Sequence, residues 1–192
     1  ASTCSVYGQS DNDDLLTETS DLNPVSLYAR TKIESERELL DMNGNFAPTV
    51  LRMATVYGLS PRMRFDLVVN VLNAKAHTEG VVPVFGGDQY RPNVHVADAA
   101  RAYVDCLEAP IEDVGHEVFN VGSTEQNYRI EELGRIVADQ YPSATLDVDA
   151  DEEDERSYRV DFSKIRDVLD YETEHTVESA CEEIGAAFER GA

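Results

Sequence analysis

The sequence predicts an α/β fold with a largely parallel sheet. Short apolar runs alternate along the chain with longer segments in which apolar residues recur at helical spacing, a pattern typical of this class. The run over residues 49–56 is nearly continuous in apolar residues, as expected of a strand buried on both faces. No internal repeat and no flexible linker interrupts the 192 residues, so we expect one folded unit.

The expected strands are short runs of apolar and β-branched residues that break at turn-forming residues. The first breaks at Gly8, the third precedes Gly86, and the fourth precedes Gly122. In chain order the expected strands span residues 2–7, 49–56, 81–85, 118–121 and 145–148.

The expected helices are the longer segments, and the residues that flank them mark their ends. The first follows Pro24 and stops at Asn43-Gly44, while Pro110 lies just beyond the third. In chain order the expected helices span residues 25–42, 65–78, 96–107, 130–141 and 177–190.

The charge balance excludes some classes of partner. The chain carries 38 acidic and 16 basic residues, a formal net charge of −22, so we expect repulsion from nucleic acid. No apolar run reaches the length of a membrane span, and we expect no membrane partner. Three widely spaced cysteines exclude a disulfide framework and fit a cytoplasmic location.

The kind of acidity is informative as well. Only three of the cations are lysines, and such lysine-poor, acid-rich surfaces are similar to those of proteins from salt-loving microbes. An ordinary acidic cytoplasmic protein is the alternative. Residues 147–155 hold seven acids in nine positions, which we interpret as a solvated surface loop rather than a metal site. We expect no metal.

The glycine pattern bears on dinucleotide binding. None of the 11 glycines forms a G-x-G-x-x-G or G-x-x-G-x-x-G spacing, the turn with which a nucleotide-binding α/β sheet normally begins. The chain also opens within the first expected strand. Either the protein is not of this kind, or the chain lacks the N-terminal half of such a sheet.

Tyr28 and Lys32 form a Y-x-x-x-K pair on the first expected helix. Residues four apart share a helix face, and a lysine ammonium near a tyrosine hydroxyl favours the phenolate, which makes the phenol a usable acid or base. Chance pairs at this spacing are common, so the context decides. Thr3 lies at the carboxyl end of the first expected strand, where open parallel sheets bind ligands.

Five segments together resemble the extended short-chain dehydrogenase/reductases, and within them the NAD-dependent sugar-nucleotide epimerase/dehydratase group. They are similar, in order and separation, to the family patterns S-[ST]-x-x-V-Y-G, Y-x-x-x-K, L-R-x-x-x-V-Y-G, R-D-x-[IV]-H-V-x-D and N-[IV]-G. The matching segments are residues 2–8, 28–32, 51–58, 91–98 and 120–122. The resemblance covers nearly the whole chain.

The resemblance implies the second half of a Rossmann-like, doubly wound parallel sheet, together with a small mixed α/β substrate-binding subdomain. We expect residues 1–60 to hold the sheet half with the catalytic threonine and the Y-x-x-x-K helix. Residues 61–192 are then mainly the substrate-binding subdomain, with 93–122 returning to the sheet. Because the glycine-rich turn would precede residue 1, we expect a fragment that binds dinucleotide poorly by itself.

The resemblance also implies a role for each motif residue. Tyr28 is the expected catalytic acid and base, Lys32 binds the nicotinamide ribose, and Thr3 holds the sugar hydroxyl. Thr55 and Val56 join Tyr28 and Lys32 as cofactor-binding residues, and the cofactor is NAD, with NADP not excluded. The expected substrate-binding residues are Thr3, Arg62, Arg64, Asn70, Arg91 and Tyr158.

Several of these residues also have an ordinary structural interpretation. From the sequence alone, Arg91 is also compatible with a surface ion pair, and the segment from Arg62 to Asp66 with a helix-capping salt bridge. Tyr158 is also compatible with a packing role. His95 lies in an apolar run, and we expect a structural histidine there.

Two departures from the family pattern bear on the reaction. The 4,6-dehydratases place Asp-Glu directly after the catalytic threonine, because eliminating water needs its own acid and base, and this chain has Cys4-Ser5 there. Where a second phosphate-binding arginine is usual the chain has Asp151, with Arg156 or Arg159 as candidate substitutes. We therefore expect an epimerase that oxidises a nucleotide-diphosphate sugar transiently to a keto-sugar.

Four alternatives stay open at this point. They are a 4-ketoreductase, a dehydratase, reduction of a small carbonyl compound, and a non-catalytic dinucleotide-sensing member of the family. Related enzymes dimerise through the Y-x-x-x-K helix, so we expect a homodimer to which Ile33, Leu39 and Leu40 contribute apolar side chains.

Overall fold

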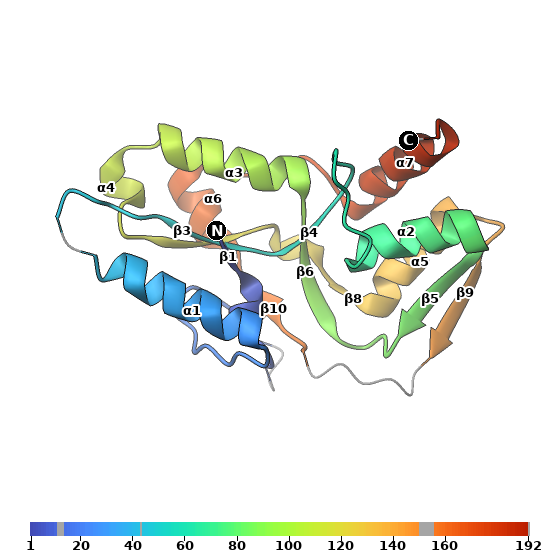
Figure 1. Ribbon diagram of the computed structural model, residues 1–192, viewed down its shortest axis with the longest axis horizontal. Helices are drawn as coiled ribbons and strands as arrows, with labels where there is room; N and C mark the ends of the chain where they lie inside the picture. Colours follow the sequence, from blue (N-terminus) through green and yellow to red (C-terminus); the bar gives the residue numbers. More distant parts are fainter. Residues whose placement is uncertain (11–13, 43, 150–155, 192) are drawn as a thin grey trace.

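The first sheet joins strands from three distant parts of the chain. The computed structural model describes residues 1–10, 14–42, 44–149 and 156–191. Strands β1 (Ser2–Thr3) and β7 (Val118–Val121) flank β3 (Val50–Met53), and both pairs are parallel. Helix α1 (Leu27–Leu40) lies on one side of this sheet and α3 (Val96–Glu108) on the other (Figure 1). The expected α/β class with parallel strands is confirmed.

A second group of elements lies at the other end of the molecule (Figure 1). Helices α2 (Val68–Glu79) and α5 (Ile130–Gln140) pack on the parallel pair of β5 (Val81–Phe85) and β9 (Thr145–Asp149). Helix α7 (Val177–Glu189) packs on α2 and α5. The buried core of this group includes Val69, Leu72, Val82, Leu133, Val137 and Ala180.

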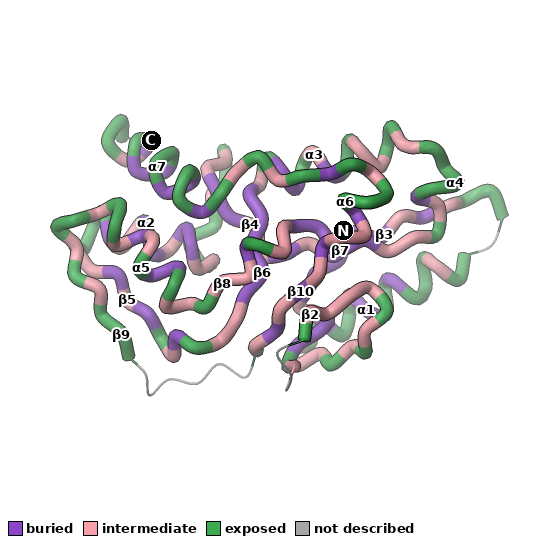
Figure 2. Tube along the Cα trace, turned by 180° about the vertical axis from the view of Figure 1, so that it is seen from behind, coloured by how far each residue is buried: buried purple, intermediate pink, exposed green. Residues whose placement is uncertain are grey.

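Strand β6 (Tyr90–His95) connects the two groups. It pairs in parallel with β4 (Thr55–Tyr57) and antiparallel with β8 (Asn127–Arg129). Figure 2 shows buried residues running along β4 and β6 through the middle of the molecule. A short parallel pair, β2 (Leu15–Leu16) and β10 (Arg159–Val160), brings late residues back beside the first group. The short helices are η1 (Cys4–Val6), α4 (Ile111–Val114), η2 (Thr124–Gln126) and α6 (Ser163–Leu169).

Two of the expected strands are wrong in extent, each for a local reason. The strand expected over residues 2–7 ends at Thr3, because the Thr3 side chain accepts a hydrogen bond from Ser5 N at 3.1 Å and caps η1. The strand expected over residues 49–56 divides at Ala54, whose N–H donates to Val121 O at 3.0 Å. Strand β3 therefore stays in the first sheet, while β4 joins β6.

The other expected elements lie close to the observed ones. The strands over 81–85 and 118–121 are confirmed. Helix α1 begins at Leu27, because Ser26 Oγ accepts from Ala29 N at 3.2 Å and caps it. Strand β6 and helix α6 were not expected, and α6 packs on β7 of the first sheet. In the acidic run, residues 147–149 belong to β9, and 150–155 lie outside the described residues.

The apolar face expected for dimer contact on α1 is smaller than its sequence suggests. Ile33 is buried in the core cluster that contains Cys4 and Val6, so it is not available to a partner. Leu39 remains 40% exposed. Within the part of the chain that the structure describes, no helix combines the length and the apolar character needed to cross a membrane.

Candidate active site

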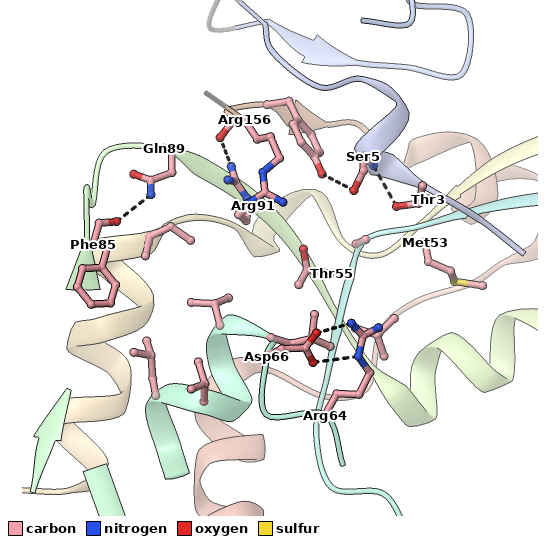
Figure 3. Close-up of a pocket in the computed structure, with 18 of the residues that line it drawn as sticks. Thr3, Ser5, Met53, Thr55, Arg64, Asp66, Phe85, Gln89, Arg91 and Arg156 are labelled. Carbon is pink, nitrogen blue, oxygen red and sulfur yellow. Dashed lines mark hydrogen bonds and ion pairs between the residues drawn. The ribbon is translucent and has the colours of Figure 1, made fainter. Parts of the chain in front are cut away.

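A cleft of about 700 Å³ lies where β1 and β3 end, between the two groups of elements. Thr3 and Met53, the last residues of these strands, both line it, as expected for ligand binding at the carboxyl ends of a parallel sheet. In Figure 3, Phe85 and Gln89 lie toward one end of the cleft and Thr3 and Ser5 toward the opposite end. The cleft is therefore long enough for its two ends to contact different parts of one ligand.

The cleft is lined by the predicted acid and base and by the residue predicted to hold the sugar hydroxyl. Thr3, which is 8% exposed, and Tyr28, which is 55% exposed, both line it. Tyr28 occupies the first turn of α1, and its side chain reaches the cleft from the helix N-terminus. Lys32 follows one turn later, with Nζ 5.8 Å from the centre of the Tyr28 ring. Lys32 Nζ also donates to Ala1 O at 3.0 Å, which ties this face of α1 to the start of β1.

Thr55 and Val56, the predicted cofactor-binding residues, line the same cleft. Both belong to β4, immediately after the break at Ala54 that separates β4 from the first sheet. Of the other two predicted cofactor-binding residues, the exposed Tyr28 also lines the cleft, whereas Lys32 is not among the residues that line it. The pyrophosphate-binding glycine turn has no counterpart in this sequence.

The lining of the cleft is mainly basic, whereas the chain as a whole is acidic. Among the described residues that line it, four are basic and only Asp66 is acidic, although the whole chain carries a net charge of −22. The four basic residues are Arg64, Lys75, Arg91 and Arg156. A cluster of cations in an otherwise acidic protein favours an anionic ligand at this place.

Arg91 is buried in the wall of the cleft. It is 8% exposed, and its Nη1 donates to Tyr90 O at 2.8 Å and to Arg156 O. Its guanidinium lies 5.9 Å from the centre of the Tyr158 ring. These backbone hydrogen bonds fix the guanidinium in one orientation, as a binding site for an anion requires.

Arg64 and Asp66 form an exposed ion pair at the cleft. Arg64 Nη2 lies 2.6 Å from Asp66 Oδ2, and Arg64 Nε lies 3.0 Å from Oδ1. The hydrogen bonds from Arg64 lower the pKa of the Asp66 carboxyl. Figure 3 shows both side chains across the cleft from Arg91 and Arg156. Arg64 therefore forms a salt bridge and also lines the cleft, but the N-cap residue of α2, Leu67, has no side-chain cap hydrogen bond, so the expected helix-capping role is not seen.

Arg62 and Asn70, two predicted substrate-binding residues, are not in the cleft wall. Asn70 is 3% exposed, and its side-chain amide is used inside the protein. Its Oδ1 accepts from Gly58 N at 3.1 Å, and its Nδ2 donates to Arg64 O at 3.0 Å. Asn70 therefore holds both ends of the loop that carries Arg64 toward the cleft.

Tyr158 lies next to the residues that follow Thr3. Tyr158 lines the cleft although it is 5% exposed, its hydroxyl lies 3.5 Å from Ser5 Oγ, and burial raises its pKa to about 12. Cys4 is 1% exposed and its Sγ donates to Arg52 O at 3.2 Å, while burial raises the thiol pKa well above its ordinary value. The groups near Thr3 are thus the neutral phenol of Tyr158, the neutral thiol of Cys4 and the hydroxyl of Ser5.

His95, Asp98 and His175 form a cluster outside the cleft. Their potential ligand atoms lie within 4.8 Å of one another, a grouping capable of holding a metal ion. However, His95 Nδ1 accepts from Ala97 N at 3.2 Å, which places the proton of the neutral ring on Nε2. Asp98 accepts from the backbone N–H groups of Glu174 and His175, both at 3.0 Å. Through these hydrogen bonds the cluster caps α3 and fixes the segment before α7, which is a structural role.

The sequence did not indicate several residues that the fold brings into the cleft. Lys75 comes from α2, Phe85 from the end of β5, and Gln89 from the turn before β6. Phe85 is 50% exposed, which is unusual for a large aromatic side chain at the end of a strand. Lys75 offered one weak signal, since it is one of only three lysines in the chain.

The sequence model of the NAD dependent epimerase/dehydratase family matches residues 1–122. The chain belongs to this family. The expected resemblance to extended short-chain dehydrogenase/reductases is confirmed, and so is the Rossmann-like fold. The cofactor class of the family is NAD, as expected.

Curated relatives are similar over much of this chain. It is 30% identical over 129 residues to an uncharacterized UDP-glucose epimerase, YtcB, of Bacillus subtilis, covering 66% of this chain and 39% of that protein. It is 28% identical over 189 residues to a dTDP-glucose 4,6-dehydratase of Xanthomonas campestris, covering 92% of this chain and 53% of that protein. The chain thus spans about half the length, or less, of these relatives.

Solved structures support the same family. A UDP-glucuronic acid 4-epimerase from Bacillus cereus, in complex with UDP-glucuronic acid and NAD, superposes with a TM-score of 0.81 at 27% identity, covering 100% of this chain and 60% of that one. An NAD dependent NDP-hexosamine 5,6-dehydratase, TunA, gives a TM-score of 0.81 at 26% identity, covering 98% and 61%. Epimerases and dehydratases both occur among the neighbours, so similarity alone leaves the reaction open.

Proposed function

We propose that this chain carries the catalytic and substrate-binding residues of an NAD-dependent nucleotide-sugar epimerase. The observation that carries the proposal is that Thr3 and Tyr28, from different elements, line one cleft together with four basic residues. Acid and base chemistry at one end and anion binding along the wall fit a diphosphate-linked sugar.

Tyr28 is the proposed acid and base. In its deprotonated form, the exposed Tyr28 oxygen accepts the proton of a sugar hydroxyl during oxidation and returns it during reduction, while Thr3 holds the same hydroxyl. The Lys32 ammonium, near the Tyr28 ring, stabilises the negative charge of that deprotonated oxygen. Tyr28, Lys32, Thr55 and Val56 would hold NAD, which would accept the hydride from the carbon of that sugar hydroxyl and return it to the same carbon.

The residues after Thr3 favour epimerisation over dehydration. Eliminating water from the sugar requires an acid and a base in addition to the tyrosine. Cys4 is a buried neutral thiol that faces Arg52 O, and Ser5 is a hydroxyl. Asp66 is the one carboxylate among the described lining residues, and it is paired with Arg64. No described residue of the cleft therefore supplies the second acid and base pair.

The far end of the cleft fits a nucleoside. Phe85 and Pro83 of β5 present an exposed aromatic ring and a flat aliphatic ring, on which a base can stack. Arg91 lines the same cleft, and a guanidinium suits a diphosphate. A sugar linked through a diphosphate would then place its hexose near Tyr28.

The test is conversion of nucleotide sugars by the full-length protein that contains this chain. UDP-glucose, UDP-glucuronic acid and dTDP-glucose are incubated with NAD in D₂O and followed by NMR and mass spectrometry. The proposal predicts a second hexose of unchanged mass with no deuterium on carbon. Loss of water with deuterium incorporation would show a dehydratase. Stoichiometric consumption of NAD(P)H in a parallel incubation with a nucleotide-linked keto-sugar would show a ketoreductase. No conversion of any sugar would favour a non-catalytic member.

A further inference from the structure

The buried stripe of α1 contains a carboxylate. Its three buried residues are Ala29, Ile33 and Glu36, spaced four and three apart along one face of the helix. The first two are the apolar side chains that such a face normally presents to a sheet. Glu36 is only 4% exposed, although it ends the same stripe.

Glu36 contacts two strands of the first sheet at once. Arg52 Nη2 of β3 lies 2.7 Å from Glu36 Oε2, and Arg52 Nε lies 3.1 Å from Oε1. Their side chains are 5–6% exposed. Ser2 Oγ of β1 donates to Glu36 Oε1 as well. Ser2 and Arg52 are direct partners in the parallel register of the two strands.

The pair is anchored further into the sheet. Arg52 Nη1 donates to Tyr7 OH at 3.1 Å, and that hydroxyl donates to Asn120 Oδ1 of β7 at 2.7 Å. Asn120 is the register partner of Arg52 on its other side. Burial by itself lowers the pKa of the Arg52 guanidinium, but the hydrogen bonds and charge interactions with Glu36 and Tyr7 together outweigh burial, and the pKa is raised. Arg52 therefore stays charged inside the protein.

Stability alone does not account for this arrangement. Replacing a buried ion pair by apolar side chains of similar volume is often neutral or stabilising, because both charges lose their hydration on burial. What an apolar contact does not provide is direction, since it permits a helix to slide and rotate on the sheet. Several hydrogen bonds of fixed geometry to Ser2 and Arg52 allow α1 only one height and one rotation.

The height and rotation of α1 matter because α1 and β1 carry the residues proposed to act on the sugar hydroxyl. Tyr28 and Lys32 lie on α1, two turns and one turn before Glu36. Thr3 follows Ser2 directly on β1. One carboxylate thus holds both the helix with the proposed acid and base and the strand with the proposed hydroxyl-binding residue.

We propose that Glu36 and Arg52 are positioning residues that fix the geometry of Tyr28 relative to Thr3. The inference rests on the proposed function, in which these two residues act on the same sugar hydroxyl. A displacement of about 1 Å between catalytic groups typically costs on the order of a hundredfold in rate. The residues proposed to stack on the nucleoside, Pro83 and Phe85, lie on β5, so substrate binding should be less affected.

The test uses the full-length protein with both charges replaced, as E36L/R52M. The control is E131L/R135M, which removes an ion pair of the same residue types from α5, where Arg135 Nη2 lies 2.5 Å from Glu131 Oε1. The proposal predicts that E36L/R52M folds with a thermal midpoint near that of the unmodified protein and loses at least about tenfold in kcat, with KM changed by less than about threefold. The control keeps both constants.

A second readout does not depend on activity. Hydrogen exchange of the α1 amides is measured in the same variants, and faster exchange is predicted in E36L/R52M at equal global stability. Unchanged kcat together with unchanged α1 exchange would overturn the proposal. If the unmodified protein converts no nucleotide sugar, the proposed function fails, and the exchange data still decide whether the pair fixes α1. Should E36L/R52M not fold, E36Q is measured in the same way, and an unchanged kcat and α1 exchange in that variant would overturn the proposal equally.

Discussion

Gly58 is the position at which the smallest change should have a large effect. It follows β4 and begins the loop that carries Arg64 and Asp66 to the cleft. Its φ of +106° is a conformation that residues with a side chain rarely adopt. A Cβ atom at Gly58 would lie 2.1 Å from Nε2 and 2.3 Å from Cδ2 of His95.

His95 has no room to move away. It is 3% exposed, its Nδ1 caps α3, and its ring stacks on that of His175 with centroids 4.2 Å apart. Backbone strain at such a residue costs about 1–3 kcal/mol, and overpacking of a buried site costs about 1–3 kcal/mol. We therefore expect Gly58→Ala to lower the free energy of unfolding by roughly 2–6 kcal/mol.

Urea denaturation followed by circular dichroism measures this change, and Gly80→Ala is the matched control. Gly80 also has a positive φ, +68°, at the C-terminal cap of α2, but no atom lies within 4 Å of its Cβ position. The control should cost only the left-handed backbone penalty, about 1–2 kcal/mol. If Gly58→Ala is destabilised no more than Gly80→Ala, the contact between Gly58 and His95 does not restrict the size of the side chain at position 58.

Three further predictions concern binding and pH. Arg91→Met should weaken UDP binding at least about tenfold in calorimetric titration, whereas the exposed Arg135→Met should not. Burial raises the pKa of Cys181 to about 11, so the stability that the neutral thiol contributes is complete below about pH 9 and is lost as the pH rises through 11. Cys181→Ala should flatten the dependence of the free energy of unfolding on pH between about pH 9 and 11, measured by urea denaturation. Burial lowers the pKa of His95, so unfolding free energy should fall as the pH drops below about 6.5, and a flat acid limb would refute that.

The sequence predicted the regular elements well where local signals agree. The runs over 81–85 and 118–121 end at glycines, and the structure has the strands there. Strand β6 was missed because Pro92 lies in its middle, and proline normally argues against an internal strand. Residues 91–95 are buried because β6 pairs with a strand on each side, and no local sequence pattern indicates that tertiary pairing.

The site residues were likewise predicted where a motif carries them, and missed where only tertiary packing brings them to the cleft. Thr3, Tyr28, Thr55 and Val56 were predicted to share a site from their motifs, and the structure places them in one cleft. Asn70 shows what motifs do not reveal, since its amide supports the loop from beneath instead of facing the cleft. Lys75 and Phe85 reach the cleft only because α2 and β5 pack across from β1, and no spacing within the sequence encodes that contact.

The central claim is that the Tyr28 hydroxyl is the acid and base of the reaction in this cleft. The most direct measurement is kcat of Tyr28→Phe in the full-length protein with its nucleotide sugar, compared with Tyr103→Phe, whose ring lies on α3 and does not line the cleft. We predict that Tyr28→Phe lowers kcat at least about a hundredfold while NAD remains bound, and that Tyr103→Phe does not. A Tyr28→Phe enzyme within about threefold of the unmodified kcat would contradict the assignment.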